Sequence, residues 1–193
     1  MKYFLLFFMI FSCVNIGNVN SQKQKNHYGH QNGIKDDYKI YIDRKISLDR
    51  MKNIVNSLEQ WKKHTSLKYH DIEIVDGASF LRSDIDKKLN VISISFTKNL
   101  TLQNKPVIGL TTTNIVHNSS IIEIDEYAYE FLSDFLFETV LEHELGHAFG
   151  IGHTDDLYFP SIMISNITSP YSMIDIQAID IFLYCMKWNC RMK

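Results

Sequence analysis

The sequence predicts one α+β domain built around a single mixed β-sheet. Of its 193 residues, 45% are hydrophobic and 22% are charged, values close to the globular average that exclude a disordered or fibrous chain. Apolar residues alternate in five short stretches and recur at helical spacing in three longer ones. These stretches follow the order strand, helix, four strands, helix, irregular segment, helix. The length suits one domain preceded by a short leader.

The leader has the pattern of a secretory signal peptide. Lys2 precedes an apolar run, Tyr3–Val14, which is too short to span a bilayer and is the length of a signal-peptide core. We place cleavage near Ser21, giving a signal peptide over residues 1–21. The alternative is an N-terminal anchor or core helix. Residues 22–36 are polar and read as a flexible linker or short pro-segment, and residues 37–193 form the predicted catalytic domain.

The five predicted strands share alternation or a high content of β-branched residues. They cover Tyr38–Ile42, Ile72–Val75, Val91–Phe96, Val107–Thr113 and Ile121–Ile124.

Three helices complete the predicted domain. The first follows Ser47 as its N-cap and has apolar residues at helical spacing up to Trp61. The second runs from about Tyr129 to Phe149, with Gly150 as its stop signal. The third runs from about Ser172 to Met186, with four residues predicted to face inward: Ile176, Ile179, Phe182 and Leu183.

Two cysteines, Cys185 and Cys190, remain after removal of the predicted leader. An even pair in a secreted chain favours a disulfide, although two free thiols are the alternative. Three Asn-x-Ser/Thr sequons are candidate glycosylation sites, beginning at Asn99, Asn118 and Asn166. These features agree with an extracellular glycoprotein.

The second helix ends in the pattern His-Glu-x-x-His-x-x-Gly-x-x-His. His143 and His147 are four residues apart, so a helix projects both from one face, and a turn at Gly150 returns His153 toward them. Three imidazoles leave a tetrahedral zinc ion one open position, which is the arrangement of a catalytic site. Five fixed positions recur by chance on the order of 10⁻⁴ times in a chain of this length. Exposed or core histidines without a metal are the alternative.

The chemistry expected of this pattern is hydrolysis. Zinc lowers the pKa of bound water to about 7, and Glu144 is placed to take a proton from that water and pass it to the leaving amine. The sequence therefore predicts a zinc-dependent endopeptidase with one catalytic Zn²⁺ and Glu144 as its general base.

The motif resembles that of the metzincin zinc endopeptidases. Ser161-Ile162-Met163 stands where this clan has its Met-turn, about ten residues after His153. Within this clan the chain most resembles the matrixins, the matrix metalloproteinase group. Three features carry that resemblance: Thr154 after the third histidine, the run Ile151–Asp156, and the pattern Ser172-x-x-Asp175-Ile176-x-x-Ile179. The resemblance covers residues 37–187 and is strongest from His143 to Met163.

The resemblance implies a zincin fold with a five-stranded mixed, twisted sheet, three helices and an active-site helix that carries the motif. It also implies that Val107–Thr113 lies near the strand lining the cleft, where an extended substrate adds by backbone hydrogen bonds. Residues Ile164–Ile167 are expected to wall the pocket for the residue after the cut. The matrixin cysteine that caps the zinc has no counterpart in residues 22–36. Calcium, with Asp125 and Glu126 as candidate ligands, has little support in the sequence.

The net charge and the lengths of the apolar runs limit the classes of partner that the chain is expected to bind. The 20 Lys and Arg residues against 22 Asp and Glu residues give a net charge of −2, which does not indicate a nucleic-acid partner. No later apolar run is long enough for a membrane span, and we expect a secreted monomer acting on a protein or peptide in extended form. Two alternatives stay open: a catalytically idle relative that binds zinc and serves as a binding module, and a protease of another metzincin family.

Overall fold

The computed structural model describes residues 37–76, 90–114, 118–165 and 172–188. The predicted signal peptide and linker lie outside these ranges, as do His117, Asn166, Ile167 and Cys190.

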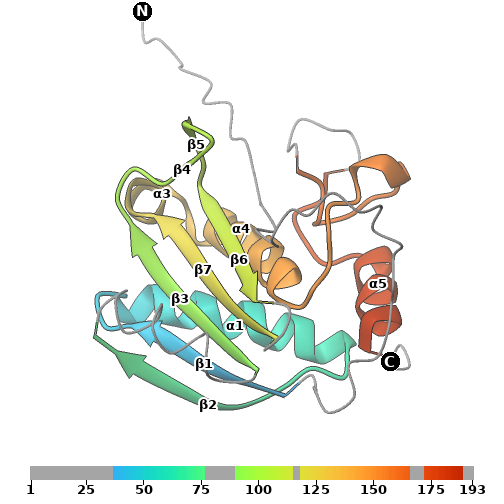
Figure 1. The fold of residues 1–193 in the computed structure, drawn as a ribbon, viewed down its shortest axis with the longest axis horizontal. Coiled ribbons are helices and arrows are strands. Elements are labelled where there is room, and N and C mark those ends of the chain that lie inside the picture. Colours follow the sequence, from blue (N-terminus) through green and yellow to red (C-terminus); the bar gives the residue numbers. More distant parts are fainter. Residues whose placement is uncertain (1–36, 77–89, 115–117, 166–171, 189–193) are drawn as a thin grey trace, which may run out of the picture.

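The centre of the fold is a five-stranded sheet with the order β2-β1-β3-β7-β6 (Figure 1). Its strands are β1 (Asp37–Asp43), β2 (Lys68–Val75), β3 (Val91–Thr97), β6 (Gly109–Asn114) and β7 (Ser119–Asp125). The first three and β7 run parallel, whereas β6 pairs antiparallel with β7 and forms one edge. All five predicted strands are present, so the prediction of a mixed sheet is confirmed.

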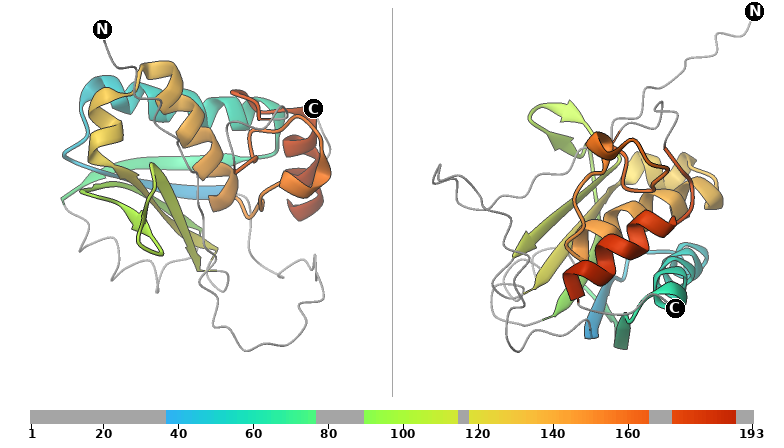
Figure 2. Two further views of the ribbon diagram at one scale, coloured as in Figure 1. Left: turned by 90° about the horizontal axis from the view of Figure 1, so that it is seen from above. Right: turned by 90° about the vertical axis from the view of Figure 1, so that its right-hand side faces the viewer.

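Helices α1 (Leu48–His64) and α4 (Asp134–Ala148) cover one face of this sheet, and α5 (Ala178–Trp188) lies beyond α4 (Figure 2). The predicted N-cap of α1 is present: the Ser47 side chain accepts a hydrogen bond from the Arg50 backbone N–H. On the inner face of α1, the Trp61 indole nitrogen donates to the Glu142 carbonyl oxygen of α4 at 3.1 Å. This bond holds the two helices side by side near the metal-binding motif.

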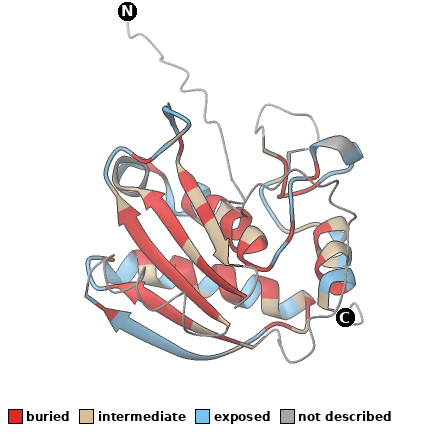
Figure 3. Cartoon of the chain, in the orientation of Figure 1, coloured by how far each residue is buried: buried red, intermediate tan, exposed pale blue. Residues whose placement is uncertain are grey.

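Aromatic side chains join these layers. Trp61, Phe149 and Tyr184 are fully buried and pack with ring centroids between 5.4 and 6.1 Å apart. Tyr38 of β1 contacts Phe149 at 5.5 Å and Trp188 of α5 at 6.3 Å. Together they bury large apolar areas between α1, α4, α5 and the sheet. Figure 3 shows this buried centre along β1, β3 and β7, whereas the edge strand β2 is mostly exposed.

Three elements differ from the prediction. The single helix predicted from Tyr129 to Phe149 is two helices, α3 (Glu126–Phe131) and α4, because Ser133 adopts an extended conformation and accepts from the Leu136 backbone N–H as the N-cap of α4. The last helix begins at Ala178 instead of about Ser172. A short hairpin, β4 (Thr101–Leu102) and β5 (Lys105–Pro106), was not predicted.

The inner face of α5 also differs. Phe182 was predicted to face inward and is 45% exposed. Ile176 and Leu183 are partly buried and pack against the core, as predicted. The buried residues of α5 are Asp180, Tyr184 and Cys185, and Asp180 accepts hydrogen bonds from the loop beneath α4.

The predicted fold class is confirmed. The domain is α+β, with a five-stranded mixed sheet, three long helices and the histidine motif on α4, which is the architecture of the metzincin-type zincin fold. Within the described residues, no helix combines the length and the apolar character needed to cross a bilayer.

Candidate metal centre

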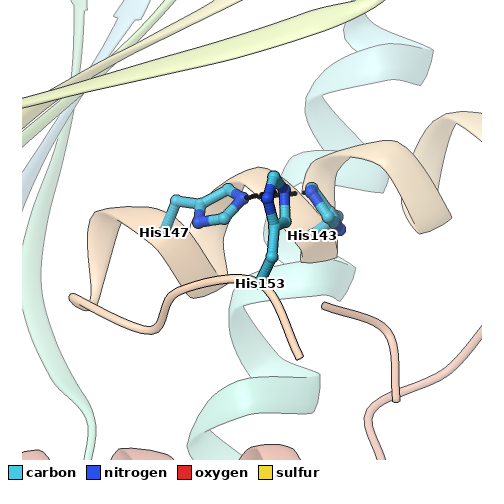
Figure 4. Close-up of side chains that lie close together, drawn as sticks. All are labelled: His143, His147 and His153. Atoms are coloured by element: carbon cyan, nitrogen blue, oxygen red, sulfur yellow. Dashed lines mark hydrogen bonds between the residues drawn. The ribbon is translucent and has the colours of Figure 1, made fainter. Parts of the chain in front are cut away.

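Helix α4 and the turn after it build the candidate site. His143 and His147 project from the same face of α4 because they are separated by four residues. The helix ends at Ala148 with Phe149 as its C-cap, and Gly150 follows with φ +85°, a left-handed conformation that lets the chain reverse. The reversed chain is held by a hydrogen bond from the Ile151 N–H to the Gly146 carbonyl oxygen at 2.9 Å. It brings His153 over the two helix histidines (Figure 4).

The three imidazoles converge on one point. The Nε2 atom of His147 lies 3.0 Å from Nε2 of His143 and 3.2 Å from Nε2 of His153. Ligands about 2 Å from a tetrahedral zinc ion lie roughly 3.3 Å from one another, so the spacing suits that ion. Among the described residues, these histidines are the one group of three or more side chains placed to hold a metal ion.

Hydrogen bonds on the far side of the rings set which nitrogen faces the centre. Nδ1 of His143 lies 2.7 Å from the Ile162 carbonyl oxygen, and Nδ1 of His147 lies 2.8 Å from the Ile151 carbonyl oxygen. A carbonyl oxygen only accepts, so each Nδ1 carries the proton and each Nε2 presents a lone pair. Two lone pairs 3.0 Å apart repel unless a cation lies between them. The donor set therefore fits a metal ion.

Burial keeps these rings neutral. Burial lowers the pKa of His143 to about 4, with further lowering from His153, against a partly offsetting hydrogen bond to Ile162. Burial also lowers the pKa of His147 and of His153. A histidine must be neutral to bind a metal, so the site is in its ligating form at neutral pH.

Met163 lies directly beneath the metal-binding helix. It is fully buried, and a Cβ atom placed on Gly146 would lie 2.3 Å from its sulfur. Gly146 lies between the two helix histidines, so the absence of a side chain there lets the loop approach the helix backbone. The structure thus places the predicted Met-turn, Ser161–Met163, below the histidines.

Glu144 does not point into solvent. It is completely buried, and its carboxylate faces strand β6, where the Thr111 hydroxyl donates to Oε2 at 2.6 Å. A Cβ atom on Gly109, two residues earlier, would lie 2.6 Å from Oε1. The predicted general base therefore lies between α4 and the predicted cleft strand.

An apolar cavity of about 230 Å³ opens beside the first histidine. Leu136, Val140 and His143 of α4 line one side of it. Ile162, Ile164 and Met173 line the other side. Ile164 is thus part of a pocket wall, as expected, while Ser165 instead bonds Asp155 and residues 166–171 are outside the described ranges.

The remaining predicted sites lie elsewhere. Cys185 is disulfide-bonded, and its predicted partner Cys190 lies outside the described residues. Asn99 is exposed in a turn. Asn118 is 8% exposed, and its Nδ2 donates to the Tyr38 hydroxyl and the Asn90 side chain, both at 3.0 Å, so a glycan there would displace both bonds.

The two candidate calcium ligands have partners within the protein. Asp125 accepts from the Leu100 N–H at 2.8 Å, and Glu126 lies 3.6 Å from Lys98.

Three residues at the site were missed by the sequence. Thr111 and Gly109 lie against Glu144 where strand β6 packs on helix α4, a long-range contact that no local pattern reports. Asp180 accepts from the Ser161 hydroxyl and the Ile162 N–H, at 2.5 and 3.1 Å. A lone acidic residue among apolar ones in the last helix was the one available signal for Asp180.

No family model matches the chain, and no curated protein matches it. A similar solved structure is high choriolytic enzyme 1, a hatching enzyme zinc-protease from Oryzias latipes (medaka fish). The two are 13% identical with a TM-score of 0.49, and the match covers 80% of this chain and 90% of that one.

Proposed function

We propose that this chain is a secreted zinc-dependent endopeptidase of the metzincin type, most like the matrixins. The observation that carries the proposal is the convergence of the Nε2 atoms of three histidines, with two of the rings fixed by backbone carbonyls. The match of Thr154, the Met-turn and the Ser172-to-Ile179 pattern supports the matrixin assignment.

His143, His147 and His153 hold the metal. A zinc ion bound there supplies a Lewis acid that polarises a peptide carbonyl and acidifies water. Glu144 then accepts a proton from the attacking water at its carboxylate and delivers it to the amine that leaves. The Met-turn supports the histidines from below, because Ile162 accepts from His143 and Met163 packs on Gly146.

The cavity and the edge strand suit a peptide substrate. Strand β6 is the edge of the sheet next to α4, and an extended peptide can add to its backbone. The cavity is lined mainly by apolar side chains and reaches His143, so it suits a large apolar residue directly after the cut. We expect cleavage profiles on a peptide library to favour leucine, methionine or phenylalanine at that position.

Secretion is supported by the leader and by Cys185. The Tyr3–Val14 run has signal-peptide character, and a disulfide at Cys185 agrees with an oxidising compartment.

The test is replacement of the general base. Wild-type protein should cleave a broad protein substrate, and Glu144→Ala should lose at least about 10³-fold in kcat while both bind one zinc ion. Glu130→Ala is the matched control, because Glu130 is exposed on α3. Equal cleavage by wild type and Glu144→Ala would overturn the mechanism. A zinc-loaded wild type without any cleavage would favour the idle binding module.

A further inference from the structure

We propose that Thr111 is a positioning residue for the Glu144 carboxylate, so that strand β6 determines the position of the general base. This inference rests on the proposed function, since it concerns the group that moves the proton. It assigns a role to a residue outside the histidine motif.

The contact is short and buried. The Thr111 side chain is 2% exposed, and its hydroxyl lies 2.6 Å from Glu144 Oε2 and 3.0 Å from the Glu144 carbonyl oxygen. The hydroxyl has one proton, and the carboxylate oxygen is the nearer acceptor, so we assign the proton to that bond. In a fully buried setting such a bond is strong, because little water competes for either group.

Gly109 supplies the space that this contact needs. Residues two apart on a strand face the same way, so Gly109 and Thr111 both face α4. A methyl group on Gly109 would lie 2.6 Å from Oε1 and 2.9 Å from the carboxyl carbon. Strand β6 thus accommodates the carboxylate at one residue and donates to it at the next residue on that face.

The sheet holds this arrangement in register. Thr111 pairs with Ile122 and Gly109 pairs with Ile124 of β7, two fully buried residues. A glutamate side chain has three rotatable bonds, and the helix alone does not determine where its carboxylate lies. The bond from Thr111 selects one orientation, which is the preorganisation that proton transfer requires.

The experiment compares Thr111→Val with Thr111→Ser. Valine keeps the shape and removes the donor, whereas serine keeps the donor. Thr97→Val is the matched control, because the hydroxyl of Thr97 on β3 also donates to a carboxylate, Oε1 of Glu123 on β7, at 2.9 Å. Kinetics on a fluorogenic peptide, zinc affinity by competition with a chelator, and urea unfolding are measured for each protein.

We expect Thr111→Val to lose about 10- to 100-fold in kcat, with KM and the zinc dissociation constant within about threefold of wild type. Thr111→Ser and Thr97→Val should retain kcat within about threefold. Gly109→Ala, which displaces the carboxylate while keeping the hydroxyl, should also lower kcat.

Three results would overturn the inference: unchanged kcat in Thr111→Val, a serine variant as impaired as the valine variant, or a loss explained by weaker zinc binding. Failure of the proposed function is distinguishable, because it would appear as full activity in Glu144→Ala. Loss of activity in Glu144→Ala with full activity in Thr111→Val would reject only the role of Thr111.

Discussion

Gly146 is the residue at which the metal-binding helix and the Met-turn come into contact. Its missing side chain leaves room for the Met163 sulfur and for the edge of Trp61, which would lie 2.3 and 3.2 Å from a Cβ atom there. All three residues are buried, so neither neighbour has open space into which to move. The packing beneath the histidines therefore depends on glycine at this position.

We expect Gly146→Ala to lower the free energy of unfolding by about 1–3 kcal/mol, because overpacking a full core forces side chains off their rotamers. It should also weaken zinc binding, since the displaced loop carries the carbonyl that bonds His143. Gly152→Ala is the control, because a Cβ atom there meets nothing within 4 Å. Urea unfolding and chelator competition measure both effects, and similar losses in the two variants would contradict this account.

The burial of His143 gives the metal-free protein a pH dependence. Its pKa is about 4 in the folded protein and 6.5 in the unfolded chain, so the unfolded chain binds more protons between these values. Stability therefore rises with pH across this window and is lost as the pH falls from 6.5 to 4. The free energy of unfolding lost through His143 alone is about 3 kcal/mol. The lowered pKa of His147 adds a further loss in the same direction.

Urea unfolding of chelator-treated protein between pH 7.5 and 4 measures this loss. His143→Asn should show a shallower dependence, because it removes the group that must be kept neutral. A pH dependence of equal slope in both proteins would show that other groups cause it.

At the residue scale, the sequence was informative where chemistry is local. The ligand spacing of His143, His147 and His153 follows from one helix and one turn, and their convergence was predictable. The partners of Glu144 were not, because the contact with Thr111 depends on which strand forms the sheet edge. Long-range pairing is not recorded in any short stretch of residues.

At the scale of elements, Asp180 joins helix α5 to the Met-turn. Its carboxylate accepts from the Ser161 hydroxyl, the Ile162 N–H and the Gln177 N–H at 2.5, 3.1 and 2.8 Å. Ile162 in turn accepts from His143 through its carbonyl oxygen. One buried carboxylate thus fixes the start of α5 and the loop under the metal centre.

We expect Asp180→Ala to cost about 2–3 kcal/mol of stability, because it removes the carboxylate that accepts from two backbone N–H groups and the Ser161 hydroxyl. Zinc affinity should fall together with stability, since the Ile162 peptide loses the bond that holds its N–H. Asp175→Ala serves as the control, because Asp175 is exposed just before the same helix. Thermal unfolding and zinc titration decide the matter, and an unchanged zinc affinity in Asp180→Ala would contradict the link.

The elements were predicted well where periodicity continues without a break. The helix predicted from Tyr129 to Phe149 is interrupted at Ser133. The Ser133 side chain accepts a hydrogen bond from the Leu136 backbone N–H and so begins a new helix there. The last helix begins at Ala178, and Ser172, its predicted start, instead forms an isolated bridge with Ser161. Such a bridge involves residues on both sides of a loop and leaves no periodic signal.

At the scale of the whole molecule, metal binding should raise stability. A ligand that binds only the folded state stabilises it by about 4 kcal/mol at a concentration 1,000 times its dissociation constant. We expect EDTA to lower the Tm and abolish proteolysis, and added zinc to restore both. Magnesium added instead of zinc is the control, and proteolysis that persists in a demonstrably metal-free protein would refute the zinc mechanism.

The fold class was predictable as a whole because three independent patterns agree: the strand count, the helix positions and the histidine motif. The sheet order was not, since alternation in β1, β2, β3 and β7 does not specify which strands are neighbours. Which strands become neighbours in the sheet depends on the connections between them and on packing across the whole domain.

The ring contact between Tyr38 of the first described strand and Trp188 of the last described helix has a consequence for biosynthesis. A nascent chain emerging from the ribosome cannot assemble this part of its interior until α5 has been translated and has cleared the exit tunnel. Until then the Tyr38 and Phe149 rings lack their final cover, and the growing polypeptide exposes apolar surface of the kind that chaperones bind. Folding of this domain therefore requires synthesis of the chain at least as far as α5, since the aromatic core lacks part of its cover without that helix.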